Sequence, residues 1–258
     1  MKKNFTDKYG PWALVTGAAM GLGEEFARQI AEQKINLVLI DMQKELLEKV
    51  ASDIAAKYNV QTKTICVDLA ELNFLKKIEA ETKDIEIGLL VNNAAYAIVN
   101  PFFNVSMEDR IREVDVNTRA PLILAYHYGK EMIKRGQGGI IFLSSLSCIQ
   151  GTAMVANYAA TKAYNQLLGE ALWYEFRKKN VDVLAFPPGA TDTPGFRSEQ
   201  PVVSSKVSVM SPKKAISIAL SALGKKPSLT PGAMNKFSFF IMSKLFPRKM
   251  AIKIMGKQ

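Results

Sequence analysis

The chain has 258 residues, 48% of them apolar, and a formal net charge of +10. This size and composition suit one soluble domain with a sizeable core, and no run approaches the roughly 20 uncharged apolar residues of a membrane-spanning helix. The sequence pI of about 9.5 would suit a nucleic-acid binder, but no nucleic-acid-binding motif is present. The two cysteines have no plausible pairing, and the charged N-terminal segment is not followed by the apolar core of a signal peptide. Both features favour a cytoplasmic protein.

Strand-like segments alternate with helical patterns along the whole chain. The segments lie near residues 13–16, 37–41, 63–67, 87–92, 139–144 and 181–186, with a seventh, short one near 228–231. This alternation predicts an α/β fold with a doubly wound parallel sheet of the Rossmann type and helices on both faces. No linker or repeat divides the chain, so we expect a single domain over 1–232, followed by a C-terminal extension over 233–258.

The first strand leads directly into a glycine-rich turn. After Thr16 the chain reads Gly17-Ala18-Ala19-Met20-Gly21-Leu22-Gly23, and a helix is predicted from about Glu24 to Gln33. Glycines here allow the backbone to approach a pyrophosphate closely, and the helix N-terminus attracts phosphate. A glycine-rich turn without a ligand is the alternative. We expect cofactor contacts from Gly17, Ala19, Met20, Gly21, Leu22 and Gly23.

An acidic residue ends the second strand, about twenty residues after the glycine turn. A carboxylate at the position of Asp41 accepts hydrogen bonds from the ribose hydroxyls and repels a 2′-phosphate. Neither Met42 nor Met20 supplies the cation that would pair with such a phosphate. The sequence therefore predicts NAD as the cofactor rather than NADP.

A serine, a tyrosine and a lysine follow the fifth strand. That strand ends at Ser145, Tyr158 opens an alanine-rich helical stretch, and Lys162 lies one helical turn later. A nearby cation lowers the pKa of a tyrosine from about 10, so Tyr158 is a candidate general acid/base and Ser145 a hydrogen-bond donor to the same substrate oxygen. Tyr126 and Tyr174 repeat the tyrosine–lysine spacing, but neither follows a serine at a strand end.

Together these motifs resemble the short-chain dehydrogenase/reductase family, in its single-domain branch, over about residues 10–232. The resemblance implies an oxidoreductase that moves a hydride between a nicotinamide cofactor and a secondary alcohol or ketone. It implies that Asn117 acts beside Ser145, Tyr158 and Lys162 by holding a proton-relay water near the lysine. Further implied cofactor contacts are Asp68, Leu69, Asn93, Ala94, Tyr158, Lys162, Pro188, Gly189, Thr191 and Thr193. The chain departs from the family at Ala95, where glycine is usual, and this methyl group would narrow the cleft slightly.

The sequence leaves the substrate open. A substrate loop is expected over about 190–210, and its apolar residues favour a medium-sized alcohol or ketone such as a steroid or an acyl chain; these are Phe196, Val202, Val203, Val207 and Met210. A 3-oxoacyl-thioester reductase of lipid metabolism and a non-catalytic NAD-binding interaction protein remain alternatives. No metal site is predicted, since His127 has no second ligand and is expected to pack or lie on the surface. Cys66, in a buried-strand pattern, and Cys148 are interpreted as reduced apolar residues.

The positive charge is concentrated at the C-terminal end. The last acidic residue is Glu199, and residues 200–258 contain 11 of the 34 lysines and arginines. Three roles remain open for the apolar, basic segment after Gly232: packing over the substrate pocket or a neighbouring subunit, lying on an anionic membrane, or attracting a phosphate-bearing substrate such as an acyl-CoA. We expect a small-molecule substrate, a homodimer or homotetramer, and no nucleic-acid partner.

Overall fold

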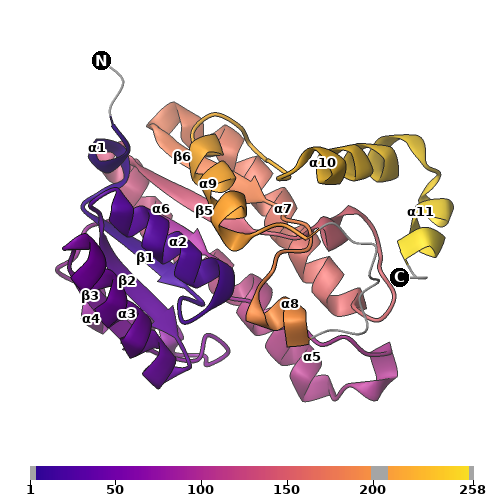
Figure 1. Ribbon diagram of the computed structural model, residues 1–258, viewed down its shortest axis with the longest axis horizontal. Helices are drawn as coiled ribbons and strands as arrows, with labels where there is room; N and C mark the ends of the chain where they lie inside the picture. Colours follow the sequence, from indigo (N-terminus) through magenta and orange to yellow (C-terminus); the bar gives the residue numbers. More distant parts are fainter. Residues whose placement is uncertain (1–3, 199–208, 256–258) are drawn as a thin grey trace.

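A parallel six-stranded sheet forms the centre of the molecule, in a computed structural model that describes residues 4–198 and 209–255 (Figure 1). The strand order is β3-β2-β1-β4-β5-β6, which reverses between β1 and β4. The strands are β1 Trp12–Thr16, β2 Asn36–Asp41, β3 Thr62–Cys66, β4 Ile87–Asn92, β5 Gly138–Leu143 and β6 Val181–Phe186. The predicted doubly wound α/β sheet is confirmed, and its order places a crevice outside the carboxyl ends of β1 and β4.

Helices cover both faces of this sheet. Their bounds are α1 Phe5–Tyr9, α2 Gly21–Glu32, α3 Lys44–Tyr58, α4 Phe74–Thr82, α5 Met107–Val114, α6 Ala120–Arg135, α7 Ala156–Phe176, α8 Pro194–Ser198, α9 Pro212–Ala222, α10 Ala233–Phe240 and α11 Arg248–Met255. Helices α2, α3 and α9 pack on one face, and α4, α6 and α7 on the other. Within residues 4–198 and 209–255, no helix has both the length and the apolar character to cross a membrane.

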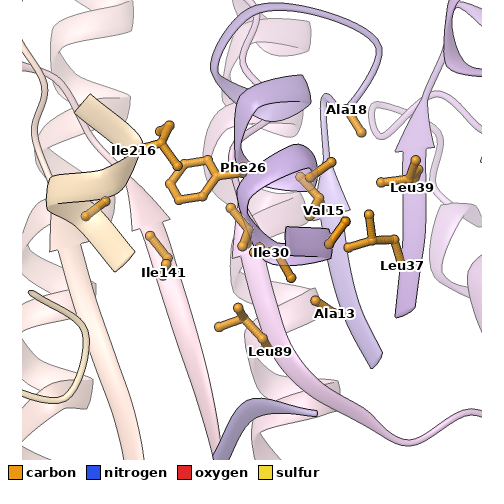
Figure 2. Close-up of a cluster of buried hydrophobic side chains, with 14 of the residues drawn as sticks. Ala13, Val15, Ala18, Phe26, Ile30, Leu37, Leu39, Leu89, Ile141 and Ile216 are labelled. Atoms are coloured by element: carbon orange, nitrogen blue, oxygen red, sulfur yellow. The ribbon is translucent and has the colours of Figure 1, made fainter. Parts of the chain in front are cut away.

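Apart from the edge strand β3, the strands are apolar at almost every position because both faces of the sheet are buried. Val15, Leu39 and Ile141 belong to the cluster that meets α2 and α9, where Figure 2 shows them around Phe26 and Ile216. The strand residues that alternate with them belong to the opposite cluster. Burial of each such aliphatic side chain contributes about 1.5–3 kcal/mol, so the sheet is a rigid support for residues at its carboxyl edge.

Two sequence expectations need correction. Helix α2 begins at Gly21, three residues before the predicted start at Glu24, so two glycines of the turn form its first turn. Cys66 is exposed rather than buried, because β3 is an edge strand and Cys66 is its last residue.

The predicted seventh strand near 228–231 is reduced to a single parallel bridge between Ala185 and Ser228. The Ala185 amide donates to the Pro227 carbonyl oxygen at 2.9 Å, and its own carbonyl oxygen accepts from the Leu229 amide at 3.1 Å. The segment therefore continues the sheet edge beyond β6 without forming a strand.

The C-terminal arm, defined here as residues 233–255, extends away from the sheet (Figure 1). It consists of α10, the π-helical turn Ile241–Leu245 and α11. Both helices of the arm contact the short 3-10 helix Leu146–Ile149 that follows β5: α10 lies against it, and Arg248 Nη1, at the start of α11, donates to the Ile149 carbonyl oxygen at 3.5 Å. The arm is thus attached on the side of the fold where β5 ends.

Candidate active site

A cavity of about 510 Å³ lies at the carboxyl ends of the central strands. The predicted site residues that line it are Gly17, Met20, Gly21, Leu22, Asp41, Asp68, Leu69, Asn93, Ala94, Ser145, Tyr158, Lys162, Pro188, Gly189, Thr191 and Thr193. Three other predicted site residues do not line the cavity but lie against residues that do: Ala19, Gly23 and Asn117. The fold therefore brings segments from the whole first 193 residues to one crevice.

Close packing explains the glycine turn. Gly17 has φ +65°, a conformation that favours glycine. A Cβ atom on Gly23 would stand 1.9 Å from the Gly17 carbonyl oxygen and 2.5 Å from Asn93 Nδ2. Only a residue without a side chain lets α2 start this close to β1, and the start of α2 consequently faces the cavity through Gly21 and Leu22.

The end of β4 is fastened to the same turn. Asn93 Nδ2 donates to the carbonyl oxygens of Thr16 at 2.9 Å and Gly17 at 3.1 Å. The Thr16 hydroxyl oxygen accepts from the Asn93 and Ala94 amides, each at 3.0 Å. Ala95 follows as an exposed residue on the cavity wall. Asn93 therefore holds the floor of the crevice together as well as lining it.

Asp41 is held at the cavity edge by backbone amides. Its Oδ2 accepts from the Ala19 amide at 3.1 Å, and its Oδ1 accepts from the Gln43 amide at 3.0 Å. Ala19 therefore orients Asp41 rather than lining the cavity, and Met20 and Met42 flank the carboxylate along the same wall.

Arg112 of α5 is a cavity residue that sequence reasoning missed. Its Nη2 forms an ion pair with Asp68 Oδ2 at 2.8 Å and lies 3.8 Å from Met42 Sδ. The guanidinium carbon also lies 5.3 Å from the centroid of the Tyr96 ring. No local pattern in the sequence singles out this arginine, because its partners come from the segments that follow β2, β3 and β4.

Tyr158 and Lys162 lie one turn apart on α7 and both line the cavity. Lys162 Nζ is 5.4 Å from the centroid of the Tyr158 ring and donates to the Leu143 carbonyl oxygen at 3.1 Å. The lysine is only 2% exposed. Burial lowers the pKa of Lys162 from 10.5 to about 8, so at neutral pH the side chain still carries its charge beside the tyrosine.

Ser145 is positioned by the end of β5. Its Oγ accepts from the Ser147 amide at 3.2 Å and caps the short helix that follows. The neighbouring Leu146 amide donates to the Pro188 carbonyl oxygen at 3.0 Å. Ser144 turns the other way, and its hydroxyl donates to the Lys162 carbonyl oxygen at 2.8 Å. Ser145 thus faces the cavity from a backbone that is tied to both the β6 edge and α7.

Asn117 is fully buried behind Lys162, in the π-helical turn Asp115–Arg119 between α5 and α6. Its Oδ1 accepts from the Tyr96 amide, and its Nδ2 donates to the Tyr96 carbonyl oxygen, both at 2.8 Å. Nδ2 also lies 3.1 Å from the hydroxyl of Thr161, the residue before Lys162. Its carbonyl oxygen accepts from Asn165 Nδ2 at 2.9 Å. This network joins α7 to the loop after β4.

The described part of the expected substrate loop closes one side of the cavity. Phe196 of α8 lines the cavity, and its amide donates to the Thr193 hydroxyl oxygen at 3.2 Å. Thr191 forms a parallel bridge with Met210. Val202, Val203 and Val207 lie outside the described residues.

The remaining residues considered in the sequence analysis as catalytic, metal-binding or reactive groups do not line this cavity. Tyr126 on α6 and Tyr174 on α7 are 76% and 57% exposed and do not line the cavity. His127 pairs with Glu79, its Nδ1 lying 3.1 Å from Oε1, and no cluster of three metal-ligating side chains occurs among the residues described. Cys148 is half-buried and unpaired, and burial raises the pKa of its thiol.

These residues fit a nicotinamide dinucleotide. The glycine contacts leave no room for side chains between the start of α2 and β1, as backbone binding of a pyrophosphate requires. Asp41 offers a carboxylate for ribose hydroxyls, and Lys162 and Tyr158 lie toward the opposite end, near Ser145. The cavity therefore combines a dinucleotide cradle with a tyrosine–lysine pair.

Comparison with known proteins agrees with this geometry. The family pattern described as short chain dehydrogenase matches residues 11–202. A 7beta-hydroxysteroid dehydrogenase of Clostridium sardiniense is 30% identical over 90% of each chain. The human "Inactive hydroxysteroid dehydrogenase-like protein 1" is 34% identical over 70% of this chain and 56% of its own length. A solved structure from work on 7beta-hydroxysteroid dehydrogenase stereoselectivity superposes with a TM-score of 0.92, at 26% identity, over 98% of this chain and 99% of its own.

Proposed function

The chain belongs to the short-chain dehydrogenase family and is an oxidoreductase of CH–OH groups, and we propose that it interconverts a steroid-like secondary alcohol and its ketone, with NAD as the preferred cofactor. The observation that carries the proposed chemistry is the buried Lys162 ammonium beside the Tyr158 ring, in a cavity that also contains Ser145. The apolar residues Val99, Val155 and Phe196 on the cavity wall, and the steroid dehydrogenase relatives, support the choice of substrate class.

In the oxidative direction Tyr158 takes the proton of the substrate hydroxyl. Lys162 stabilises by its charge the Tyr158 phenolate that accepts this proton, and Ser145 holds the substrate oxygen by a hydrogen bond. Asn117 holds a water that carries the proton from Lys162 toward solvent. The cofactor, when bound, supplies the hydride acceptor, and the protein provides position and proton transfer.

A panel of hydroxysteroids and other secondary alcohols tests this proposal, with NADH formation followed by its absorbance near 340 nm. Tyr158→Phe should lower kcat by at least about a hundredfold, the usual scale for a positioned proton donor, and should leave cofactor affinity nearly unchanged. Tyr174→Phe is the control, because this exposed tyrosine lies on the same helix. Wild-type turnover in Tyr158→Phe would reject the assignment. Failure of the wild type with every substrate, despite cofactor binding, would favour a non-catalytic NAD-binding protein.

The cofactor preference follows from Asp41. Its carboxylate would lie near a 2′-phosphate, and a close like-charge pair near a surface is worth about 1–4 kcal/mol. We therefore expect kcat/KM to favour NAD over NADP by about tenfold or more. The double variant Asp41→Ser, Met42→Arg should shift the preference toward NADP. Equal use of both cofactors by the wild-type enzyme would contradict this role of Asp41.

We also propose a cytoplasmic homodimer or homotetramer. Unpaired Cys66 and Cys148 support the compartment. Exposed apolar side chains on α6 and α7, among them Leu122, Tyr126 and Leu167, support self-association. The molecular mass in solution distinguishes the two assemblies.

For the C-terminal extension, residues 233–258, we propose packing over the substrate side of the cavity or a neighbouring subunit, with secondary contact to an anionic membrane. Asn235 supports the first role, because it lies against Gly189, a residue of the cavity wall. The second role is supported by exposed apolar and basic side chains on the arm: Met234, Lys236, Phe237, Lys244, Leu245, Lys249, Ile252, Lys253 and Ile254.

A further inference from the structure

The part of the cavity formed by Asp41 and Asp68 contains a cation as well as these two carboxylates. Among the described residues that line the cavity, the cationic side chains are Arg112 and Lys162. Lys162 is bound beside Tyr158 at the proposed catalytic end. Arg112 is therefore the cation available to the part of the cavity near Asp41, the predicted partner of the ribose hydroxyls.

The contacts of Arg112 place its guanidinium beside Met42 and Asp68, two cavity residues that follow β2 and β3. It lies 3.8 Å from Met42 Sδ, and Met42 directly follows Asp41, the proposed partner of the ribose hydroxyls. The contacts with Asp68 and with Met42 both use the same nitrogen, Nη2. Because a guanidinium has five N–H donors, Arg112 can bind a second anion without leaving Asp68. Its side chain is 29% exposed, so it can also reorient.

We infer that Arg112 is a specificity-determining residue for the cofactor: its guanidinium pairs with the 2′-phosphate of NADP and partly offsets the repulsion from Asp41. This inference rests on the proposed nicotinamide site and refines its selectivity. A guanidinium is suited to this task because it binds phosphate through two parallel hydrogen bonds. NADP would then bind more weakly than NAD, but by a smaller factor than Asp41 alone would impose.

A second role for Arg112 has a different signature. If the arginine only orients Asp68 as a cofactor contact, its loss weakens the binding of NAD and NADP equally. If it pairs with the 2′-phosphate, its loss weakens NADP more than NAD. The ratio of the two affinities therefore isolates the phosphate contact, because effects on the shared adenine and pyrophosphate contacts cancel.

The test is calorimetric binding of NAD⁺ and NADP⁺ to the full chain, with 5′-ADP and 2′,5′-ADP as probes that lack nicotinamide. The variants are Arg112→Gln, which removes the charge, and Arg112→Lys, which retains it. The matched control is Arg28→Gln, because Arg28 is 25% exposed, is ion-paired with Glu24 and does not line the cavity.

We expect Arg112→Gln to lower the NADP⁺ affinity about tenfold more than the NAD⁺ affinity. The affinity for 2′,5′-ADP should fall relative to the affinity for 5′-ADP in the same way. Arg112→Lys should restore much of this difference, and Arg28→Gln should leave it unchanged. In an Asp41→Ser background, NADP⁺ should become the preferred cofactor with Arg112 present and lose that preference with Arg112→Gln. An unchanged NADP⁺/NAD⁺ ratio in Arg112→Gln, in both backgrounds, would overturn the inference.

Binding separates this inference from the proposed activity. If the dinucleotides bind with the expected ratios and no alcohol is oxidised, the inference holds and the proposed reaction fails. If alcohols are oxidised and the ratio does not respond to Arg112, the reaction holds and the inference fails. Absence of any dinucleotide binding by the wild type would refute both.

Discussion

Lys162 carries a charge where the fold offers little solvation. It is 2% exposed, and its described polar contact is the Leu143 carbonyl oxygen. Burial disfavours the ammonium form and lowers its pKa to about 8. The buried Lys162 therefore destabilises the folded chain while it supplies the cation beside Tyr158. Such a conflict between stability and activity is common at functional sites.

Removal of this charge should stabilise the protein and abolish its activity. Burial lowers the pKa of Lys162 from 10.5 to about 8, so the charged side chain destabilises the folded state by about 3 kcal/mol. Its hydrogen bond to the Leu143 carbonyl oxygen offsets about 1 kcal/mol of this cost, and the substitution loses that bond. Lys162→Met should then raise the free energy of unfolding near pH 7 by about 2 kcal/mol, measured by urea denaturation without cofactor.

The pH dependence supplies the check on this prediction. Between pH 8 and 10.5 the unfolded chain binds more protons at Lys162 than the folded chain, so the contribution of Lys162 to stability rises with pH across that window. The advantage of Lys162→Met over wild type should shrink accordingly. An advantage that is absent at pH 7, or constant up to pH 10.5, would show that burial does not penalise the lysine.

Sequence and structure agree at the residue scale where the chemistry is local. Tyr158 and Lys162 are one helical turn apart, so their spacing alone places them together. Arg112 could not be found this way, since its contacts with Met42 and Asp68 join α5 to the segments after β2 and β3, which are distant in the sequence. The resemblance identified Asn117, but its bonds to Tyr96 and Asn165 required the tertiary structure.

At the scale of elements, the start of α2 shows packing acting against local preference. Glycine disfavours the helical state by about 1 kcal/mol relative to alanine, which is why the sequence predicted a helix only from Glu24. The close contact of Gly23 with Gly17 and Asn93 extends the helix to Gly21. A residue that weakens a helix in isolation here permits it to begin beside β1.

Gly23→Ala should therefore disrupt this element. Its Cβ atom would stand 1.9 Å from a backbone oxygen, and overpacking of this kind destabilises by about 1–3 kcal/mol. We expect a lower Tm and at least about tenfold weaker NAD⁺ binding. Gly151→Ala is the control, because nothing lies within 4 Å of a Cβ atom at that position. Equal effects of the two substitutions would contradict the proposed role of the turn.

At the scale of the whole molecule, the sheet was predictable because its strands other than the edge strand β3 are largely buried and read as nearly continuous apolar runs. The seventh segment was not, because four residues that read Ser-Leu-Thr-Pro over 228–231 do not reveal whether they form a full ladder, and they form one bridge. The distribution of charge is also a property of the whole molecule. Residues 200–258 contain no acidic residue, and the C-terminal arm, which belongs to this range, extends away from the sheet (Figure 1).

Truncation after Gly232 tests the proposed roles of the extension. Loss of apolar packing, worth about 25 cal/mol per Å², should cause aggregation or raise KM for an apolar alcohol. Full-length protein should co-sediment with vesicles that contain anionic lipid and lose this affinity at high salt, since each lysine near the surface adds about 1 kcal/mol. Vesicles of neutral lipid are the control. A soluble, fully active truncated protein, together with no lipid binding by the full chain, would reject both roles.

The most direct measurement of the central claim follows the hydride itself. The protein is incubated with NADH deuterated at both C4 positions and with a ketosteroid, and the alcohol product is analysed by mass spectrometry. We expect one deuterium on the new carbinol carbon with wild-type protein and at least about a hundredfold slower product formation with Tyr158→Phe. Alcohol product without deuterium, or formation at equal rates by both proteins, would contradict hydride transfer at this site.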